Sequence, residues 1–423
     1  MQPSHILWNL TGLVLPLLVA FFTVPPLIEK LGPERFGLLA LAWGLIGYAG
    51  ALDLGIGRAL TQTVARMRGE GDSTSIPAAL TTAARITLIT GAAGCFLIAI
   101  TALLGVDAML KTESVPSGEI KRAVLLMALA LPAQAMSATY RGMNEAYLNF
   151  KSISMIRIGL GMVNFGGPFL MAFYTKSMFW LVSTLVVSRI LALILYHHFA
   201  VACLADGKNV LKRADYSPKI AKDLFRFGGW VTVSSIVSPL LLQADRFVIA
   251  AVISAAAVAI YVVPYEVVVQ SLVLVGAVSS VIFPTLSKLV HEKPEKWQAF
   301  FRRWLLIVTG IMLAVCSLLA IFLPLILQLW LKGNFTPLSA VIGQVLCLGV
   351  FANAIGAMYY ALLHARGRAD LTAKIHLTEL PLFLLLLISC LNQFGIVGAA
   401  WAWVGRMMFD TIALAFCSRL RHA

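Results

Sequence analysis

The stretch WLLIVTGIMLAVCSLLAIFLPLILQLWL, residues 304–331, contains no charged side chain. Crossing the hydrocarbon core of a bilayer takes roughly 20 predominantly apolar residues in a helix. A helix is favoured there because each backbone amide can form its hydrogen bond within the same segment. Residues 304–331 therefore predict a membrane-spanning helix, and the same pattern recurs along the chain.

The composition of the whole chain agrees with a bilayer environment. Of 423 residues, 60% are hydrophobic and 12% are charged, with a mean hydropathy of +0.89. A soluble domain carries about 25% charged residues, so a soluble chain of this length would lack a polar surface. We expect an all-α polytopic membrane protein whose transmembrane helices cover residues 6–28, 36–58, 80–104, 123–140, 153–174, 178–203, 228–250, 258–286, 304–331, 338–363, 375–391 and 396–418.

The first of these segments is expected to be a retained helix, because it is too long for the core of a signal peptide. Prolines inside the segments lack the N–H that a helix needs, so each is expected to kink its helix or to free a carbonyl for a neighbour. Examples are Pro16, Pro132, Pro239, Pro264 and Pro324.

The basic residues predict an orientation for these helices. If the N-terminus is cytoplasmic, 23 Lys and Arg residues fall on the cytoplasmic side and eight on the other. This bias follows the positive-inside rule and places both termini in the cytoplasm. The formal charge of +14 is then explained by orientation and by contact of the loops with anionic lipid, and not by nucleic-acid binding.

A polar stretch suggests how the helices are grouped. Residues 205–226 form a basic cytoplasmic linker between an N-terminal lobe, residues 1–204, and a C-terminal lobe, residues 227–423, of six helices each. Pro16 precedes Phe36 by 20 residues, and Pro239 precedes Ala259 by the same interval. We expect the lobes to be a parallel, pseudo-symmetric repeat.

The segment ALDLGIGRALTQ, residues 51–62, places an acid before two glycines. A nucleotide-binding loop is excluded, because no strand precedes the segment and the third glycine is missing. Asp53 can cap the end of the second helix, pair with Arg58, or belong to a polar site. Gly55 and Gly57 would allow a second helix to approach closely.

Charged residues deep in the predicted helices are functional candidates, because a charge at the bilayer centre costs about 2.5–3.5 kcal/mol on insertion scales. Arg406 and Asp410 lie one turn apart and can form an ion pair. Arg189 has no acid within its own helix. It must meet either an acid from another helix or an anionic substrate.

Helices seven and eight carry a second group of candidates, Asp245, Arg246, Glu266 and Gln270. Glu266 and Gln270 share a helix face, and Glu266 follows a proline-loosened turn. Glu266 can bind a cation or a proton, or it can form a salt bridge with Arg246.

Uncharged polar residues in the predicted helices can line a polar site together with these charged candidates. Asn9 and Gln243 either belong to it or form hydrogen bonds between helices. Glu379 lies about one turn into its helix, from which it is expected to reach the cytoplasmic interface, so it is not included among the candidates.

The sequence contains no enzyme signature. It lacks H-E-x-x-H, G-x-S-x-G and P-loop motifs, and its six cysteines form no C-x-x-C pair. We therefore expect no catalytic residue, no cofactor and no metal site. Transport against a gradient would have to use an ion gradient, the membrane potential or removal of the product.

Three segments resemble a known family: NLTGLVLPLLVAFFTVPPLIEKLGPERFGLLAL (9–41), DLGIG (53–57) and FGGWVTVSSIVSPLLLQADRFVIA (227–250). They are similar to bacterial polysaccharide biosynthesis membrane proteins, the Wzx-type flippases of lipid-linked oligosaccharides. Their superfamily includes MATE multidrug exporters and lipid II flippases. The matching positions are Asn9, Pro16, Gly32 to Gly37, Asp53 to Gly57 and Ala244 to Arg246.

The resemblance implies two six-helix lobes around a cleft that opens to each side in turn and is lined by helices one, two, seven and eight. The residues then assigned to a substrate and coupling cleft are Asn9, Asp53, Gln243, Asp245, Arg246, Glu266 and Gln270, with Arg189, Arg406 and Asp410 as a second set. Lipid II flippases usually have two more helices and several cationic residues in the cleft of the first lobe, whereas this sequence predicts twelve helices and has no Arg or Lys in the interior of helix one or two.

The function implied is movement of an undecaprenyl-diphosphate-linked oligosaccharide across the bacterial inner membrane, coupled to a proton or a monovalent cation if coupled at all. A polysaccharide polymerase and glycosyltransferases are the implied partners. Two alternatives stay open. One is a MATE-like cation-coupled drug antiporter, which would need an acidic, aromatic cleft. The other is a scaffold for glycan assembly that transports nothing.

Overall fold

The computed structural model describes residues 3–105, 110, 112–204, 215–292, 297–366 and 368–419. Within these ranges the regular structure is helical throughout, and no strand is present. The chain divides into two compact units, Met1–Gln243 and Ala244–Ala423, and the division falls inside the long helix α10 (Pro218–Val252).

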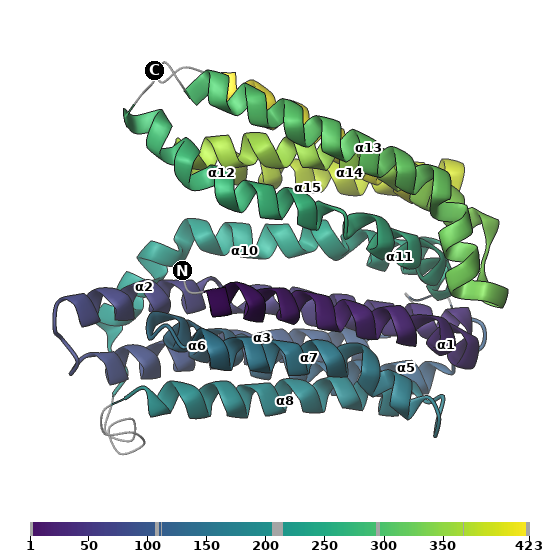
Figure 1. Ribbon diagram of the computed structural model, residues 1–423. Helices are drawn as coiled ribbons and strands as arrows, with labels where there is room; N and C mark the ends of the chain where they lie inside the picture. Colours follow the sequence, from purple (N-terminus) through teal and green to yellow (C-terminus); the bar gives the residue numbers. More distant parts are fainter. Residues whose placement is uncertain are drawn as a thin grey trace. The chain divides into compact units, whose positions relative to one another are not determined.

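The first unit is organised around α6, which contacts α2, α3 and α8. Figure 1 shows α1, α7 and α8 extending along the same direction, with α7 in contact with both of the others. The elements of this unit before α10 are α1 (Pro3–Ala49), η1 (Gly50–Asp53), α2 (Ile56–Gly69), α3 (Ile76–Leu103), α5 (Ser117–Ala128), α6 (Ala130–Ala146), α7 (Phe150–Met171) and α8 (Met178–Ala202).

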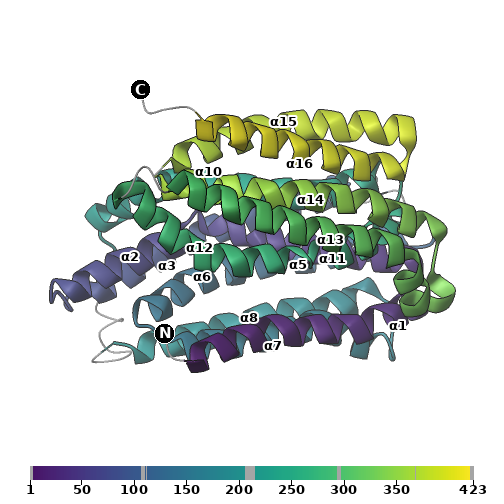
Figure 2. The ribbon, with the colours of Figure 1, turned by 45° about the horizontal axis from the view of Figure 1, so that its top comes forward.

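The second unit is built on α14, which contacts α11, α12, α13 and α16. Figure 2 shows α13, α14 and α16 running along one another, with α15 beside α16. The elements after α10 are α11 (Ala255–Val269), α12 (Leu272–Glu292), α13 (Trp297–Leu331), η2 (Lys332–Asn334), α14 (Pro337–Ala365), α15 (Ala369–Phe394) and α16 (Ile396–Arg419).

The helices are those of a multi-pass membrane protein. In the described part of the chain, nine helical spans are long and apolar enough to cross a membrane, by length and composition alone. Large apolar side chains lie two-thirds exposed on several of them, including Phe22, Ile321 and Leu385. Such faces would be unfavourable in water, whereas hydrocarbon tails accept them without cost.

Each of the twelve predicted segments contains α-helix, and the differences lie at some of the ends and at breaks inside three segments. The expected loop between the first two helices is a kink in α1 at Gly32, whose φ of 78° is readily adopted only by glycine. The second predicted segment ends at Ala49, earlier than Arg58. The eighth segment breaks between α11 and α12, after Val269.

The prolines differ in their effects. Helix α5 ends at Ala128 and α6 begins at Ala130, close before Pro132. Pro132 has no N–H to donate to the carbonyl of Ala128, which explains the break. Helices α11 and α13 continue across Pro264 and Pro324.

Helix α2 begins inside the last three residues of the second predicted span, and the rest of it lies where no helix was predicted. It is amphipathic: Ile56, Leu60 and Val64 are completely buried at intervals of four residues, while Arg58 and Arg66 are exposed. The buried face packs into the core formed with α3 and α6. At fourteen residues α2 is too short to cross a bilayer.

Candidate functional site

One group of ionisable side chains joins α10 to α11, and we call it the α10–α11 cluster: Asp245, Arg246, Tyr261, Tyr265 and Glu266. Asp245 is 1% exposed. Its Oδ1 accepts a hydrogen bond from the backbone N–H of Arg246 at 2.8 Å, and its Oδ2 accepts one from the Tyr261 hydroxyl at 2.8 Å. Both carboxylate oxygens are therefore satisfied despite their burial.

Arg246 connects this buried carboxylate to the surface of the unit. Its Nη2 lies 2.6 Å from Oε1 of Glu266, and its guanidinium lies over the Tyr265 ring at 5.5 Å. The Arg246 side chain is 6% exposed and that of Glu266 is 49% exposed. Of the two alternatives for Glu266, the salt bridge to Arg246 is confirmed.

The α10–α11 cluster has one unsatisfied donor. The buried Nε of Arg246 has no hydrogen-bond partner among the residues that the structure describes. A guanidinium holds its donors in a planar fork that matches carboxylate and phosphate oxygens. Since Glu266 is bound through Nη2, Arg246 retains donor capacity at Nε for a further anionic oxygen.

The two glutamines of the predicted set lie near this cluster in sequence. Gln270 is half-buried at the C-terminus of α11, one turn after Glu266. Gln243 of α10 lies close to Gly47 of α1, and its buried Oε1 has no partner in the described part of the chain. The side chain of Asn9, in α1, lies outside the described residues.

Asp53 lies at the junction between η1 and α2 and is 8% exposed. Its Oδ1 accepts a hydrogen bond from the N–H of Gly55 at 3.0 Å. Gly55, with φ 72°, is the residue before α2, so the carboxylate lies at the N-terminal, electropositive end of that helix. Asp53 therefore lies before the start of α2 and not at the end of the second predicted helix, which stops at Ala49.

The close approach expected at the glycines is present at Gly57. A Cβ atom at Gly57 would lie 2.6 Å from the carbonyl oxygen of Ala138, which is too close. A Cβ atom at Gly142 would clash with the carbonyl oxygen of Gly57. Thr61 donates across the same contact to Gly142 at 3.0 Å. The glycines of DLGIG therefore shape a turn and a helix contact.

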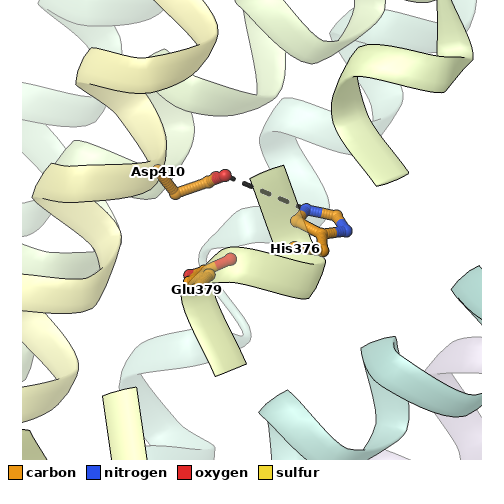
Figure 3. Close-up of side chains that lie close together, drawn as sticks. All are labelled: His376, Glu379 and Asp410. Carbon is orange, nitrogen blue, oxygen red and sulfur yellow. Dashed lines mark ion pairs between the residues drawn. The ribbon is translucent and has the colours of Figure 1, made fainter. Parts of the chain in front are cut away.

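A second group of ionisable side chains joins α15 to α16, and we call it the α15–α16 cluster: His376, Glu379, Arg406 and Asp410. Nε of Arg406 lies 2.7 Å from Oε1 of Glu379. His376 Nε2 lies 3.8 Å from Oδ1 of Asp410 (Figure 3). The sequence interpretation of Glu379 was wrong: the residue is 1% exposed, because α15 packs against α16 at this level.

Arg189 of α8 is half-buried and meets neither a carboxylate nor a second cation within the described ranges. Its Nη2 donates to Oδ1 of Asn164 in α7 at 3.1 Å, and its Nε is buried without a partner there. The sequence predicted that Arg189 meets either an acid from another helix or an anionic substrate. The structure instead shows the side-chain amide oxygen of Asn164 as its partner.

The predicted site residues fall in both units. Asp53, Arg189 and Gln243 lie in the first unit, and the remaining described candidates lie in the second. Within the second unit, Asp245, Arg246 and Glu266 come together, whereas Arg406 and Asp410 belong to the separate α15–α16 cluster. That all seven first-choice residues line one cleft stays a prediction.

Sequence reasoning missed Tyr261 and Tyr265, which hold the α10–α11 cluster together. Their rings stack on each other at 5.8 Å, and Tyr265 also contacts the ring of Trp403 in α16 at 5.6 Å. The signal was the four-residue spacing in YVVPYE, residues 261–266, which places both tyrosines on one helix face.

The fold defines the class of protein. A search of solved structures finds the inward-facing conformation of a multidrug resistance MATE family transporter of the MOP superfamily, with a TM-score of 0.77. The two proteins are 13% identical, and the similarity covers 96% of each chain. The chain has the MATE fold, and its described residues contain helices and no strand.

Residues 4–290 match the polysaccharide biosynthesis protein family, and the chain belongs to that family. It is 29% identical over 410 residues to the putative O-antigen transporter of Shigella flexneri, covering 96% of this chain and 95% of that one. It is 24% identical to the lipopolysaccharide biosynthesis protein WzxC of Escherichia coli (strain K12), covering 97% of this chain and 79% of WzxC.

Proposed function

We propose that the protein is a flippase that moves an undecaprenyl-diphosphate-linked oligosaccharide from the cytoplasmic to the outer leaflet of the bacterial inner membrane by alternating access. The observation that carries the proposal is similarity over almost the whole chain to a putative O-antigen transporter. Membership of the polysaccharide biosynthesis family and the MATE fold support it. The oligosaccharide is an O-antigen, capsule or exopolysaccharide repeat unit.

The chemistry of such a substrate explains what the protein has to supply. A hydrated sugar and a diphosphate cannot enter hydrocarbon, because their hydrogen bonds to water would be lost without replacement. The protein replaces that water with polar side chains while the lipid tail stays in the bilayer. The protein is a transporter, and it makes or breaks no covalent bond in its substrate.

Arg246 is the residue proposed to bind the diphosphate. Its present partner, Glu266, is half exposed and can rotate away, whereas the guanidinium is buried and held over Tyr265. A phosphate oxygen then takes the position of the Glu266 carboxylate. Glu266, released from its partner, is then available to bind a proton or a monovalent cation, and this exchange couples the two binding events.

The orientation and the partners belong to the same proposal. Both termini face the cytoplasm, as the distribution of Lys and Arg favours, and the basic loops contact anionic lipid. Glycosyltransferases supply the substrate and a polysaccharide polymerase consumes it.

The proposal is tested by expressing variants in a strain whose own copy of the gene is deleted. Arg246→Ala and Glu266→Gln are each expected to lower surface polysaccharide at least about tenfold, because a hydrogen bond to a charged group is worth about 1.5–3 kcal/mol. The amount of variant protein in the membrane fraction is measured in parallel and should stay near the wild-type level.

A matched control uses the ion pair of Arg368 and Asp370, whose side chains are each about one-third exposed. Arg368→Ala and Asp370→Asn should leave the polymer unchanged. Wild-type polymer in the Arg246 and Glu266 variants would remove both residues from the site. Drug sensitivity of the deletion strain with intact surface polymer would overturn the flippase proposal in favour of a drug antiporter.

A further inference from the structure

Three potential metal ligands converge between α15 and α16. His376, Glu379 and Asp410 each offer one ligand atom, and these atoms all lie within 4.8 Å of one another. His376 and Glu379 are three residues apart, so they share one face of α15. Asp410 projects from α16 toward His376, and Glu379 lies one turn along α15 (Figure 3).

Two carboxylate oxygens in this group are buried without a hydrogen bond. Glu379 is 1% exposed, and its Oε2 has no partner in the part of the chain that the structure describes. The same holds for Oδ1 of Asp410, which faces His376 Nε2 at 3.8 Å. A buried carboxylate oxygen without a donor is costly, so a positively charged partner would stabilise both.

The charges near these oxygens favour a cation. When both are ionised, Glu379 and Asp410 bring two negative charges, and Arg406, which pairs with Glu379, brings one positive charge. Arg406 binds Glu379 through Oε1, at 2.7 Å, which leaves Oε2 of the same carboxylate available to another ligand. Arg406 can therefore hold the Glu379 carboxylate in place through Oε1 while Oε2 binds the metal, as outer hydrogen-bond partners commonly do for metal ligands.

The aromatic surroundings leave His376 available as a ligand. Its ring lies parallel to that of Tyr360 at 6.3 Å, and Tyr360 also stacks on His364 at 4.1 Å. His364 is directed to the hydroxyl of Thr372, at 3.3 Å. The nearest acid to His376 Nε2 is Asp410, at a distance too long for a hydrogen bond, so Nε2 can donate a lone pair to a metal.

The ligand types indicate which cations fit. An imidazole nitrogen binds first-row transition metals and zinc, whereas sodium, magnesium and calcium prefer oxygen ligands alone. Ferritin-like helical bundles bind metals with a Glu and a His three residues apart on one helix and carboxylates from facing helices; here the two residues have the same spacing in the opposite order. Ligand atoms at about 2.0–2.2 Å from a tetrahedral metal lie about 3.3–3.6 Å apart, so side-chain rotations would have to draw these three atoms closer together to close the site.

We propose that His376, Glu379 and Asp410 bind one divalent transition-metal ion of the zinc class, which links α15 to α16. The site is distinct from the α10–α11 cluster, and its existence does not depend on which substrate the protein transports. Solvent or a side-chain rearrangement completes the coordination, because three protein ligands leave at least one position open.

The test uses full-length protein in detergent, purified with an affinity tag that lacks histidine. Zn²⁺ should bind with a stoichiometry of one in titration calorimetry and should raise the melting temperature. Co²⁺ should bind in its place and give a visible absorption spectrum. His376→Gln and Asp410→Asn should each weaken Zn²⁺ binding at least about tenfold. Glu379 is left intact so that Arg406 keeps its partner.

His198→Gln serves as the matched control, because His198 lies on α8 in the other unit, and its Zn²⁺ affinity should equal that of the wild type. Absence of Zn²⁺ and Co²⁺ binding by the wild type would overturn the proposal, and this measurement does not depend on whether a variant folds. Equal Zn²⁺ affinity of wild type and both variants would also overturn it. A melting-temperature response to Na⁺ alone would replace it with a monovalent-cation site.

Discussion

The α10–α11 cluster and the α15–α16 cluster have similar components but are satisfied in different ways. In the first, both oxygens of the buried Asp245 accept hydrogen bonds, and the exposed member, Glu266, has a side chain that is 49% exposed. In the second, Glu379 is sealed at 2% side-chain exposure with one oxygen unpaired. The half-exposed Glu266 can exchange with another anion at Arg246, whereas the sealed carboxylate of Glu379, with one oxygen unpaired, can retain a bound cation.

The largest effect on stability is expected where the ion pair is closed. Arg406→Ala would leave the carboxylate of Glu379 buried without its counter-ion, which typically costs about 3–5 kcal/mol. The melting temperature of the purified variant should fall further than that of Tyr261→Phe or Glu266→Gln. A melting temperature equal to that of the wild type would show that water reaches Glu379 and would break the contrast between the clusters.

An intermediate effect is expected at the saturated end of the α10–α11 cluster. Tyr261→Phe removes only the hydroxyl that donates to Oδ2 of Asp245 at 2.8 Å. An unsatisfied buried oxygen costs about 1–3 kcal/mol, so the variant should be less stable than the wild type but more stable than Arg406→Ala. Tyr265→Phe is the control, because it also removes a hydroxyl and keeps the ring, but it leaves the hydrogen bond from Tyr261 to Asp245 in place. A Tyr261→Phe variant as stable as the wild type would contradict a role for this hydrogen bond.

The smallest effect on stability is expected at the open edge. Glu266→Gln removes the half-exposed partner of a buried guanidinium, but Asp245 remains beside Arg246 as a second carboxylate, so the cost should fall below the about 3–5 kcal/mol of breaking a fully buried pair. Its melting temperature should stay close to that of the wild type while its transport falls. Loss of transport without loss of stability would set Glu266 apart from Glu379, whose pairing is expected to be mainly structural. A large loss of stability would show that Glu266 is mainly structural as well.

The sequence predicted the helices well because membrane spans leave a strong compositional signal. The charge-free stretch 304–331 lies within α13, and each of the twelve segments contains α-helix. Helix α2 was missed because its amphipathic pattern lies on a helix of only fourteen residues in a polar region. The kink at Gly32 and the break before Pro132 follow from local backbone chemistry, which the sequence contains.

The site was harder to predict, because side chains from different helices meet according to packing. The pairing of Arg246 with Glu266 could be anticipated, since their helices are joined by a short turn. The contact of Arg189 with Asn164 and the pairing of Arg406 with Glu379 depend on how helices are rotated. Glu379 was misplaced because counting turns from a helix end gives depth and not the facing direction.

The central claim is that this protein moves a lipid-linked oligosaccharide between leaflets, and the most direct test is reconstitution. Lipid-linked oligosaccharide extracted from the deletion strain is placed in liposomes with purified protein, and the fraction of sugar accessible to an external lectin is followed over time. We predict a protein-dependent rise in that fraction for the wild type and a much slower rise for Arg246→Ala. An accessible fraction that is the same with and without protein would contradict the account.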